Sequence, residues 1–111
     1  MRMLVGAVLL TISSMSLAQY APMLNEALLR EAMENLVENP SGAAFDYVTY
    51  KRNKDADDWT MCGRVSLKTA HGSDAGTEYF IGMVAAGEDR PYYYVFSVGG
   101  LSDQLCQLEG L

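Results

Sequence analysis

Between residues 22 and 38, apolar positions recur with the period of an amphipathic helix. The segment opens at Ala21-Pro22-Met23, and proline suits a first helical turn. Glutamates occupy the side opposite the apolar positions. The apolar face consists of Leu24, Leu28, Ala32 and Leu36, flanked by Leu29, Met33 and Val37. Because the residue before a proline avoids helical geometry, Asn39-Pro40 ends this helix, which we expect to cover one face of a sheet.

Four later segments have the alternation and the β-branched and aromatic content of strands. They comprise residues 44–51, 59–68, 77–85 and 92–98. Charged and glycine-rich connections separate them, which favours antiparallel pairing of successive strands. Leu101, Leu105 and Leu108 stand at helical spacing after Ser102 and Asp103, so residues 101–108 favour a short helix over a fifth strand. The pattern predicts an α+β fold, with an N-terminal amphipathic helix packed on an antiparallel sheet of four to five strands.

Alternation also predicts which side chains share a face of the sheet. In the first strand, one side is expected to carry Phe45, Tyr47 and Thr49, and the other side Asp46, Val48 and Tyr50. In the second strand, the polar side carries Thr60, Cys62, Arg64, Ser66 and Lys68. A buried cysteine fits poorly among such neighbours. Gly63 therefore predicts a β-bulge within this strand that re-aims the side chains around it.

The first 18 residues have the organisation of an export signal. A short basic start precedes an apolar run from residue 4 to residue 12, and Ser16 and Ala18 suit the −3 and −1 positions of a cleavage site. The run is too short to span a bilayer comfortably. The alternative is a buried first helix of the domain. We expect residues 1–18 to be a signal peptide and residues 19–111 to form a single α+β domain, periplasmic or secreted, with no stable membrane insertion after cleavage.

Cys62 and Cys106 are the two cysteines of the chain. In an oxidising compartment, two cysteines without a competitor most simply form one disulfide. Under the chain-entropy description, closing this loop stabilises the fold by about 4 kcal/mol. Two free buried thiols are the alternative, and a catalytic dithiol is disfavoured because the cysteines are far apart in sequence.

The acidic balance narrows the classes of partner. The formal net charge is −6, with 14 acidic residues against 8 basic ones. This composition disfavours nucleic acid and anionic membrane surfaces, both of which require basic patches. It is compatible with a cationic partner, but a surface that serves solubility is the favoured interpretation.

Two segments carry a family likeness. Residues 38–45 (Glu-Asn-Pro-Ser-Gly-Ala-Ala-Phe) resemble a Pro-Ser-x-Ala-x-Phe segment that closes the first helix in a group of small exported bacterial proteins of uncharacterised function. Residues 62–68 (Cys-Gly-Arg-Val-Ser-Leu-Lys) resemble the Cys-Gly-x-Val-x-x-Lys motif of the same group. The likeness continues through the glycines at 72 and 76 into Phe80-Ile81 and spans roughly half of the expected mature chain. The resemblance implies a fold type and a setting in the cell envelope, and no reaction.

The chain departs from that group at one turn. His71, Ser73 and Asp74 stand where members often carry phenylalanine, glycine and an aromatic residue. The three residues are also the types of a catalytic triad. A triad needs a base that reaches the nucleophile and an acid behind it, which neighbours on one tight turn rarely achieve, so a solvated turn is the favoured interpretation. A small hydrolase that uses these residues remains a third hypothesis.

Neither metal nor cofactor chemistry is predicted. Asp55, Asp57 and Asp58 lack the spacing of an EF-hand and are interpreted as a solvated charge run. One histidine and two paired cysteines are insufficient for zinc. A candidate binding surface comprises Arg64 and Lys68, which project from the polar side of the second strand, and Tyr93, which is expected on the outer side of the fourth. A solvated sheet face and an amphipathic edge strand are the favoured interpretation of these residues.

The leading hypothesis is a non-enzymatic binding or structural module of the cell envelope with an envelope or secreted protein as its partner. It rests on the missing catalytic constellation and on the aromatic and basic strand faces. The alternative is an acidic protein inhibitor of a cationic hydrolase such as a lysozyme, suggested by the small, acidic and disulfide-linked character of the chain. The pattern predicts no particular oligomeric state.

Overall fold

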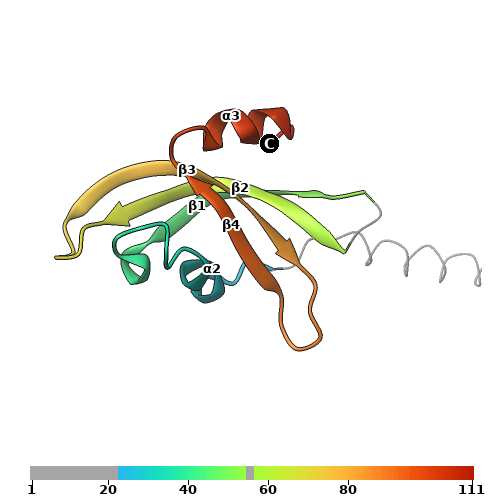
Figure 1. The fold of residues 1–111 in the computed structure, drawn as a ribbon, viewed down its shortest axis with the longest axis horizontal. Coiled ribbons are helices and arrows are strands. Elements are labelled where there is room, and N and C mark those ends of the chain that lie inside the picture. The colour runs from blue at the N-terminus through green and yellow to red at the C-terminus, as the bar shows by residue number, and fades with distance from the viewer. Residues whose placement is uncertain (1–22, 55–56) are drawn as a thin grey trace, which may run out of the picture.

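The computed structural model of the 111-residue chain describes residues 23–54 and 57–111. The predicted signal peptide lies outside these residues. Helix α2 (Glu26–Ala32) and the short 3-10 helix η1 (Pro40–Gly42) precede four strands, β1 (Ala44–Arg52), β2 (Asp58–Lys68), β3 (Asp74–Ala85) and β4 (Tyr92–Val98). Helix α3 (Ser102–Leu108) ends the fold (Figure 1). The last segment is therefore a helix, and the sheet has four strands.

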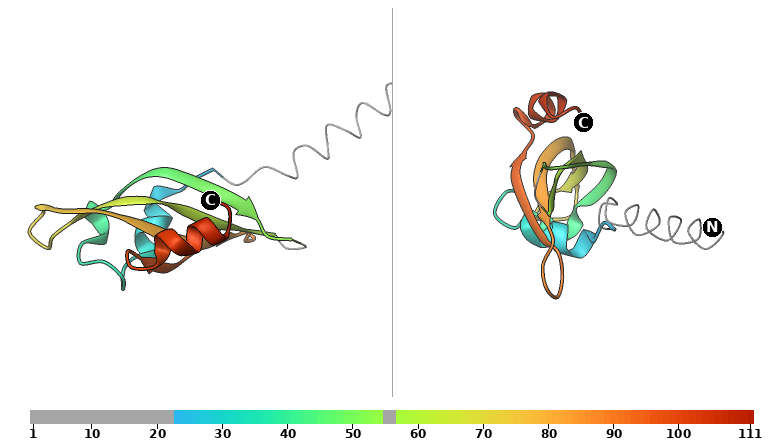
Figure 2. Two further views of the ribbon diagram at one scale, coloured as in Figure 1. Left: turned by 90° about the horizontal axis from the view of Figure 1, so that it is seen from above. Right: turned by 90° about the vertical axis from the view of Figure 1, so that its right-hand side faces the viewer.

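The sheet is antiparallel, in the order β1-β2-β3-β4. Helix α2 lies against one face and helix α3 against the other, which makes three layers (Figures 1 and 2). Sequential antiparallel strands need only short connections, and the polar segments between them supply these. In the described part of the chain, no helix is long and apolar enough to cross a membrane.

Helix α2 is shorter than the apolar pattern predicts. The Asn25 side chain caps its start by accepting from the backbone N–H of Leu28 at 3.1 Å, and Arg30 pairs with Glu26 at 3.3 Å. After Ala32 the chain turns back toward the sheet, and Arg30 Nε donates to the carbonyl of Ala43 at 2.8 Å. A seven-residue helix is marginal in water, so packing of its apolar face must hold it.

The main core lies between α2 and the sheet. Its fully buried members are Leu29, Met33, Ala43, Met61, Val65 and Phe80. Phe45 meets the ring of Phe80 edge to face, with 5.7 Å between ring centroids. Met61, Val65 and Leu67 contribute from β2, as the alternation of that strand predicts.

A β-bulge reverses the predicted faces of β1. Asp46 pairs with Arg64 and Thr49 pairs with Cys62, so Tyr47 and Val48 together oppose Gly63. Tyr47 adopts a positive φ of 53°, which is unusual outside glycine. Beyond the bulge, Val48 and Tyr50 therefore join Phe45 on the core side, and the predicted grouping of Phe45 with Tyr47 and Thr49 is wrong.

The predicted bulge was assigned to the wrong strand. The extra residue belongs to β1, and β2 keeps its alternation through Gly63. Gly63 serves instead as a close-packing point, because a Cβ atom there would lie 3.0 Å from both Val48 Cγ2 and Phe80 Cε1. The absence of a side chain admits the extra residue opposite.

A second bulge decides the orientation of β4. Ile81 pairs with Ser97 and Gly82 pairs with Val95, which leaves Phe96 as the additional residue. Tyr93 lies against the main core, and its hydroxyl accepts from the backbone N–H of Asn25 at 3.0 Å. The expectation that Tyr93 faces outward is thus wrong.

Candidate binding cleft beside the disulfide

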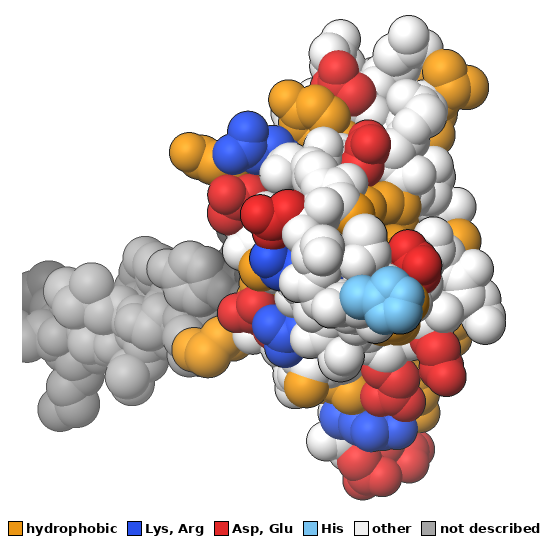
Figure 3. All heavy atoms as spheres, turned by 90° about the vertical axis from the view of Figure 1, so that its left-hand side faces the viewer, with side chains coloured by type: hydrophobic (Ala, Val, Ile, Leu, Met, Phe, Trp, Pro, Cys, Tyr) orange, Lys and Arg blue, Asp and Glu red, His pale blue; other side chains and the backbone are white. Residues whose placement is uncertain are grey.

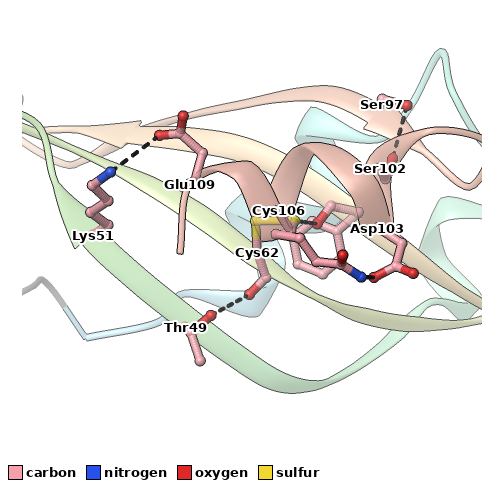
Figure 4. Close-up of a disulfide and its surroundings, with 10 residues drawn as sticks. Thr49, Lys51, Cys62, Ser97, Ser102, Asp103, Cys106 and Glu109 are labelled. Atoms are coloured by element: carbon pink, nitrogen blue, oxygen red, sulfur yellow. Dashed lines mark hydrogen bonds and ion pairs between the residues drawn. A yellow bond between two sulfur atoms is a disulfide. The ribbon is translucent and has the colours of Figure 1, made fainter. Parts of the chain in front are cut away.

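Helix α3 packs on the sheet through its small residues. Ser102 and Cys106 are buried, whereas Leu101 and Leu108 are 63% and 81% exposed. The Sγ atoms of Cys62 and Cys106 are bonded, with 6.0 Å between the Cα atoms (Figure 4). The predicted disulfide is present, and it explains how Cys62 can be buried on the polar face of β2. The last helix covers that position and forms a second small cluster with Ile81 and Leu111.

Polar contacts fix the direction in which α3 crosses the sheet. At its start, Ser102 Oγ donates to Ser97 Oγ at 2.9 Å, and just past its end Glu109 pairs with Lys51 of β1 at 3.9 Å (Figure 4). The helix therefore runs from β4 across β3 to β1. Its disulfide lies between these two contacts, so α3 is held at three points.

A cleft of about 290 Å³ opens between α3 and the bulge of β1. The disulfide lies at its wall together with Gly63, and the side chains around it are Tyr47, Thr49, Arg64, Tyr79, Asp103 and Leu111. These residues come from three strands, from the first turn of α3 and from the segment after it. The volume lies at the lower end of the range of ligand sites in proteins.

Arg64 is the most constrained polar group of the cleft. Its Nε and Nη2 atoms lie 3.4 and 3.5 Å from the two carboxylate oxygens of Asp46, and its guanidinium carbon lies 4.4 Å from the centroid of the Tyr47 ring. The hydrogen bond to Asp46 raises the pKa of Arg64 above its ordinary value. The guanidinium is thus a fixed positive charge stacked on an aromatic ring that is 73% exposed.

The cleft combines charge of both signs with aromatic surface. Asp103 adds a carboxylate, and Gln107 Nε2 donates to it at 3.3 Å. Tyr79 contributes a half-exposed ring from β3. Rings, a guanidinium and a carboxylate around a small opening are suited to recognising a side chain of another molecule. Within residues 23–54 and 57–111, no group of three or more His, Cys, Asp or Glu side chains is placed to hold a metal ion.

The remaining predicted surface residue lies away from this cleft. Lys68 forms an ion pair with Asp74, and this contact lowers the pKa of the Asp74 carboxyl. The stem of Lys68 packs beside Gly42, where a Cβ atom would lie 2.8 Å from Lys68 Cγ. Of the three predicted surface residues, Arg64 alone lines the cleft.

The candidate triad is dispersed over the β2–β3 turn. His71 and Ser73 are exposed, and the chain's single histidine is visible on the face shown in Figure 3. The backbone N–H of Ser73 donates to Thr69 Oγ1 at 3.2 Å, and that of Gly72 to the carbonyl of Thr69 at 3.0 Å. Asp74 pairs with Lys68 rather than with His71. These are the contacts of an ordinary tight turn.

Sequence reasoning missed Tyr47, Tyr79 and Asp103 as parts of the site. Alternation placed Tyr47 on the same side of the strand as Phe45, and only the bulge turns it to the other face. Asp103 was interpreted as a helix-starting residue, and its position at the same cleft as Arg64 depends on how α3 crosses the sheet. The one available signal was Gly63 next to Cys62, which marked the right part of the sheet.

A scan against protein-family models, a search of the curated proteins and a search of the solved structures each find no match to this chain.

Proposed function

We propose that the protein is an exported, non-enzymatic binding module of the bacterial envelope, and that the cleft beside the disulfide receives a side chain of a partner protein. The observation that carries the proposal is the stacked pair of Arg64 and Tyr47. Tyr47 retains a left-handed conformation that costs an L-residue about 1–2 kcal/mol, and such costs concentrate at functional positions.

The chemistry of the partner follows from the charges. Asp46 neutralises Arg64, and Asp103 leaves the cleft with an excess carboxylate. The chain as a whole has a formal net charge of −6 at pH 7. A partner with a basic surface, offering an aromatic or basic side chain to Tyr47 and Tyr79, is complementary to this arrangement.

Affinity capture from an envelope extract tests the proposal. The exported protein and its Arg64→Ala variant serve as baits at low salt, with Arg52→Ala as the control because Arg52 pairs with Asp57 away from the cleft. We expect one set of partners to be retained by the control and lost by Arg64→Ala. Equal capture by all three baits, or robust turnover by the unmodified protein on a broad panel of hydrolase substrates, would contradict the proposal.

Inhibition of a cationic hydrolase is a second candidate, supported by the outer side of the α2 region. Glu26 pairs with Arg30, whereas Glu31, Glu34 and Glu38 form no ion pair within the described part of the chain and are exposed. Such carboxylates suit a cationic surface. Inhibition of a panel of lysozymes that weakens with added salt would support this candidate, and unchanged lysozyme activity would remove it.

A further inference from the structure

The hairpin of β2 and β3 extends beyond the rest of the sheet. Strand β4 ends at Val98, opposite Phe80, while β3 begins six residues before Phe80, at Asp74. Residues 74–79 therefore have β2 on one side and no paired strand on the other among the described residues. The arm projects past both helices in Figures 1 and 2. All six residues are exposed.

The hydrogen-bonding groups of this edge can be assigned from one contact. The backbone N–H of Gly99 donates to the carbonyl of Tyr79 at 2.7 Å, so the backbone of Tyr79 faces the open side of β3. Backbone groups alternate between the two edges of a strand, and Thr77 therefore directs its N–H and C=O to the same open side. Unpaired groups of this kind form a template for another strand.

A groove lies along the same edge on the α2 side of the sheet. It encloses about 350 Å³, and its apolar wall consists of Leu36, Val37, Leu67, Ala75 and Val98. The turn after α2 forms its far side, and Gly99-Gly100 close the end where the chain leaves β4. An added strand would direct alternate side chains into this groove.

The charges at the groove select among possible strands. Glu38 and Glu78 line it, and neither forms an ion pair within residues 23–54 and 57–111. Lys68 also lines it, but its charge is already matched by Asp74. The groove thus presents uncompensated negative charge beside an apolar wall, and acidic side chains are spread over this side of the molecule in Figure 3.

We propose that the free edge of β3 binds an extended segment of a partner protein by strand addition. The segment continues the line of β4, places aliphatic side chains in the groove and carries a lysine or arginine toward Glu38 and Glu78. A bulge between Asp74 and Thr77, with Gly76 at φ 94°, limits the regular edge. The paired part is therefore short, about three residues (77–79) or roughly 10 Å at the rise of a strand.

The inference goes beyond the cleft proposed above. The groove opens on the α2 side of the sheet and the cleft on the α3 side, so Glu78 in the groove and Arg64 in the cleft report on different faces. Either surface can fail its test without affecting the other.

A peptide probe tests strand addition directly. The exported protein is titrated with an acetylated and amidated hexapeptide in which valine alternates with a polar residue, either lysine or threonine. Amide hydrogen exchange of the protein is followed by NMR. We expect exchange at Thr77 to slow at least about tenfold on binding, since its N–H becomes hydrogen-bonded. The control peptide has the same sequence with N-methyl groups on alternate backbone nitrogens, which removes the ladder donors, and it should give no protection.

Variants separate the backbone and charge contributions. Glu78→Lys should lower the affinity for the peptide about fivefold at low salt, and this difference should diminish at high salt. Glu34→Lys, which lies outside this groove, should leave the affinity unchanged. Thr77→Pro removes the backbone N–H that the added strand needs, and it should therefore abolish the peptide-induced chemical-shift changes at the neighbouring amides of β3. Circular dichroism and the non-reduced mass confirm that each variant keeps its fold and its disulfide.

Two results would overturn the inference. One is a Thr77 amide that exchanges equally fast with and without saturating peptide, or peptide-induced shifts confined to the cleft around Arg64. The other is protection of Thr77 that grows with protein concentration and without peptide, because the occupant would then be a second copy of this chain.

Discussion

Cys62 and Cys106 join a strand in the middle of the chain to a helix whose leucines face away from the sheet. In most amphipathic helices apolar burial holds the helix in place. Here Ser102 and Cys106 form the buried side, and the covalent bond substitutes for the missing apolar contact. The wall of the cleft therefore depends on the disulfide.

Removing the disulfide should destabilise the fold and loosen α3 first. For the double variant Cys62→Ala/Cys106→Ala, we expect a loss of about 2–4 kcal/mol in the free energy of unfolding, measured by urea denaturation. Amides of α3 should exchange faster than those of β2. The native protein should be lighter than its reduced form by two hydrogen atoms. Equal masses in the two states would show that the thiols are free.

Tyr47 allows the conformational cost of the bulge to be measured. Tyr47→Ala keeps the unfavourable positive φ, whereas Tyr47→Gly removes the penalty. We expect Tyr47→Gly to be more stable than Tyr47→Ala by about 1 kcal/mol in thermal or urea unfolding. Both variants lose the stacking on Arg64 and should lose the partners that Arg64→Ala loses. A glycine variant less stable than the alanine variant would argue against the left-handed conformation.

Gly63 should tolerate no side chain. A Cβ atom at this position meets Val48 and Phe80 at 3.0 Å, and both belong to the packed face of the sheet. Gly63→Ala should therefore cost about 1–3 kcal/mol in unfolding free energy. Gly72→Ala is a useful comparison, because its site is sterically open but has φ 85°. Gly72→Ala is expected to show only the conformational penalty of a positive φ. Equal unfolding curves for the wild type and Gly63→Ala would contradict the predicted steric contact of a Cβ atom with Val48 and Phe80.

Tyr50 should make stability fall at alkaline pH. Burial, with a smaller contribution from Tyr93, raises the pKa of Tyr50 to about 12 from 10.0. The folded state therefore holds this proton more tightly than the unfolded state. Stability from this group is complete below pH 10 and is lost as pH rises from 10 toward 12.

The matched variant for this pH dependence is Tyr50→Phe. The hydroxyl of Tyr50 is buried without a hydrogen-bond partner among the described residues, so its removal should be neutral or stabilising near pH 7. Urea midpoints between pH 8 and 12 should decline less steeply for the variant. Parallel declines in the two proteins would assign the alkaline loss to other groups.

Local patterns accounted for the strands and failed at the points where two strands meet. Periodicity placed four strands within a few residues of their observed positions, with β3 beginning at Asp74 rather than at residue 77. It misassigned Tyr47, which lies in a bulge defined by its partner strand, and Tyr93, whose strand is irregular at Phe96. A single extra residue reverses the face of everything beyond it.

The cleft shows the same division. Arg64 was recognisable as an outward-facing residue, while Tyr47, Tyr79 and Asp103 come from separate elements. The spacing of the C-terminal leucines predicted the helix, but the bond at Cys106 turns the opposite side of that helix to the sheet. The spacing of apolar residues within the seven-residue helix α3 does not determine which of its sides faces the sheet.

By itself, the amino-acid sequence determined the antiparallel α+β class and the partner of each cysteine, since periodicity and a pair of cysteines act locally or without competitors. Only the tertiary structure decided which faces are buried, where α3 lies and which side chains meet beside the disulfide. The physical reason is that bulges and crossing directions depend on contacts between strands distant in sequence, and these contacts form only when the sheet does.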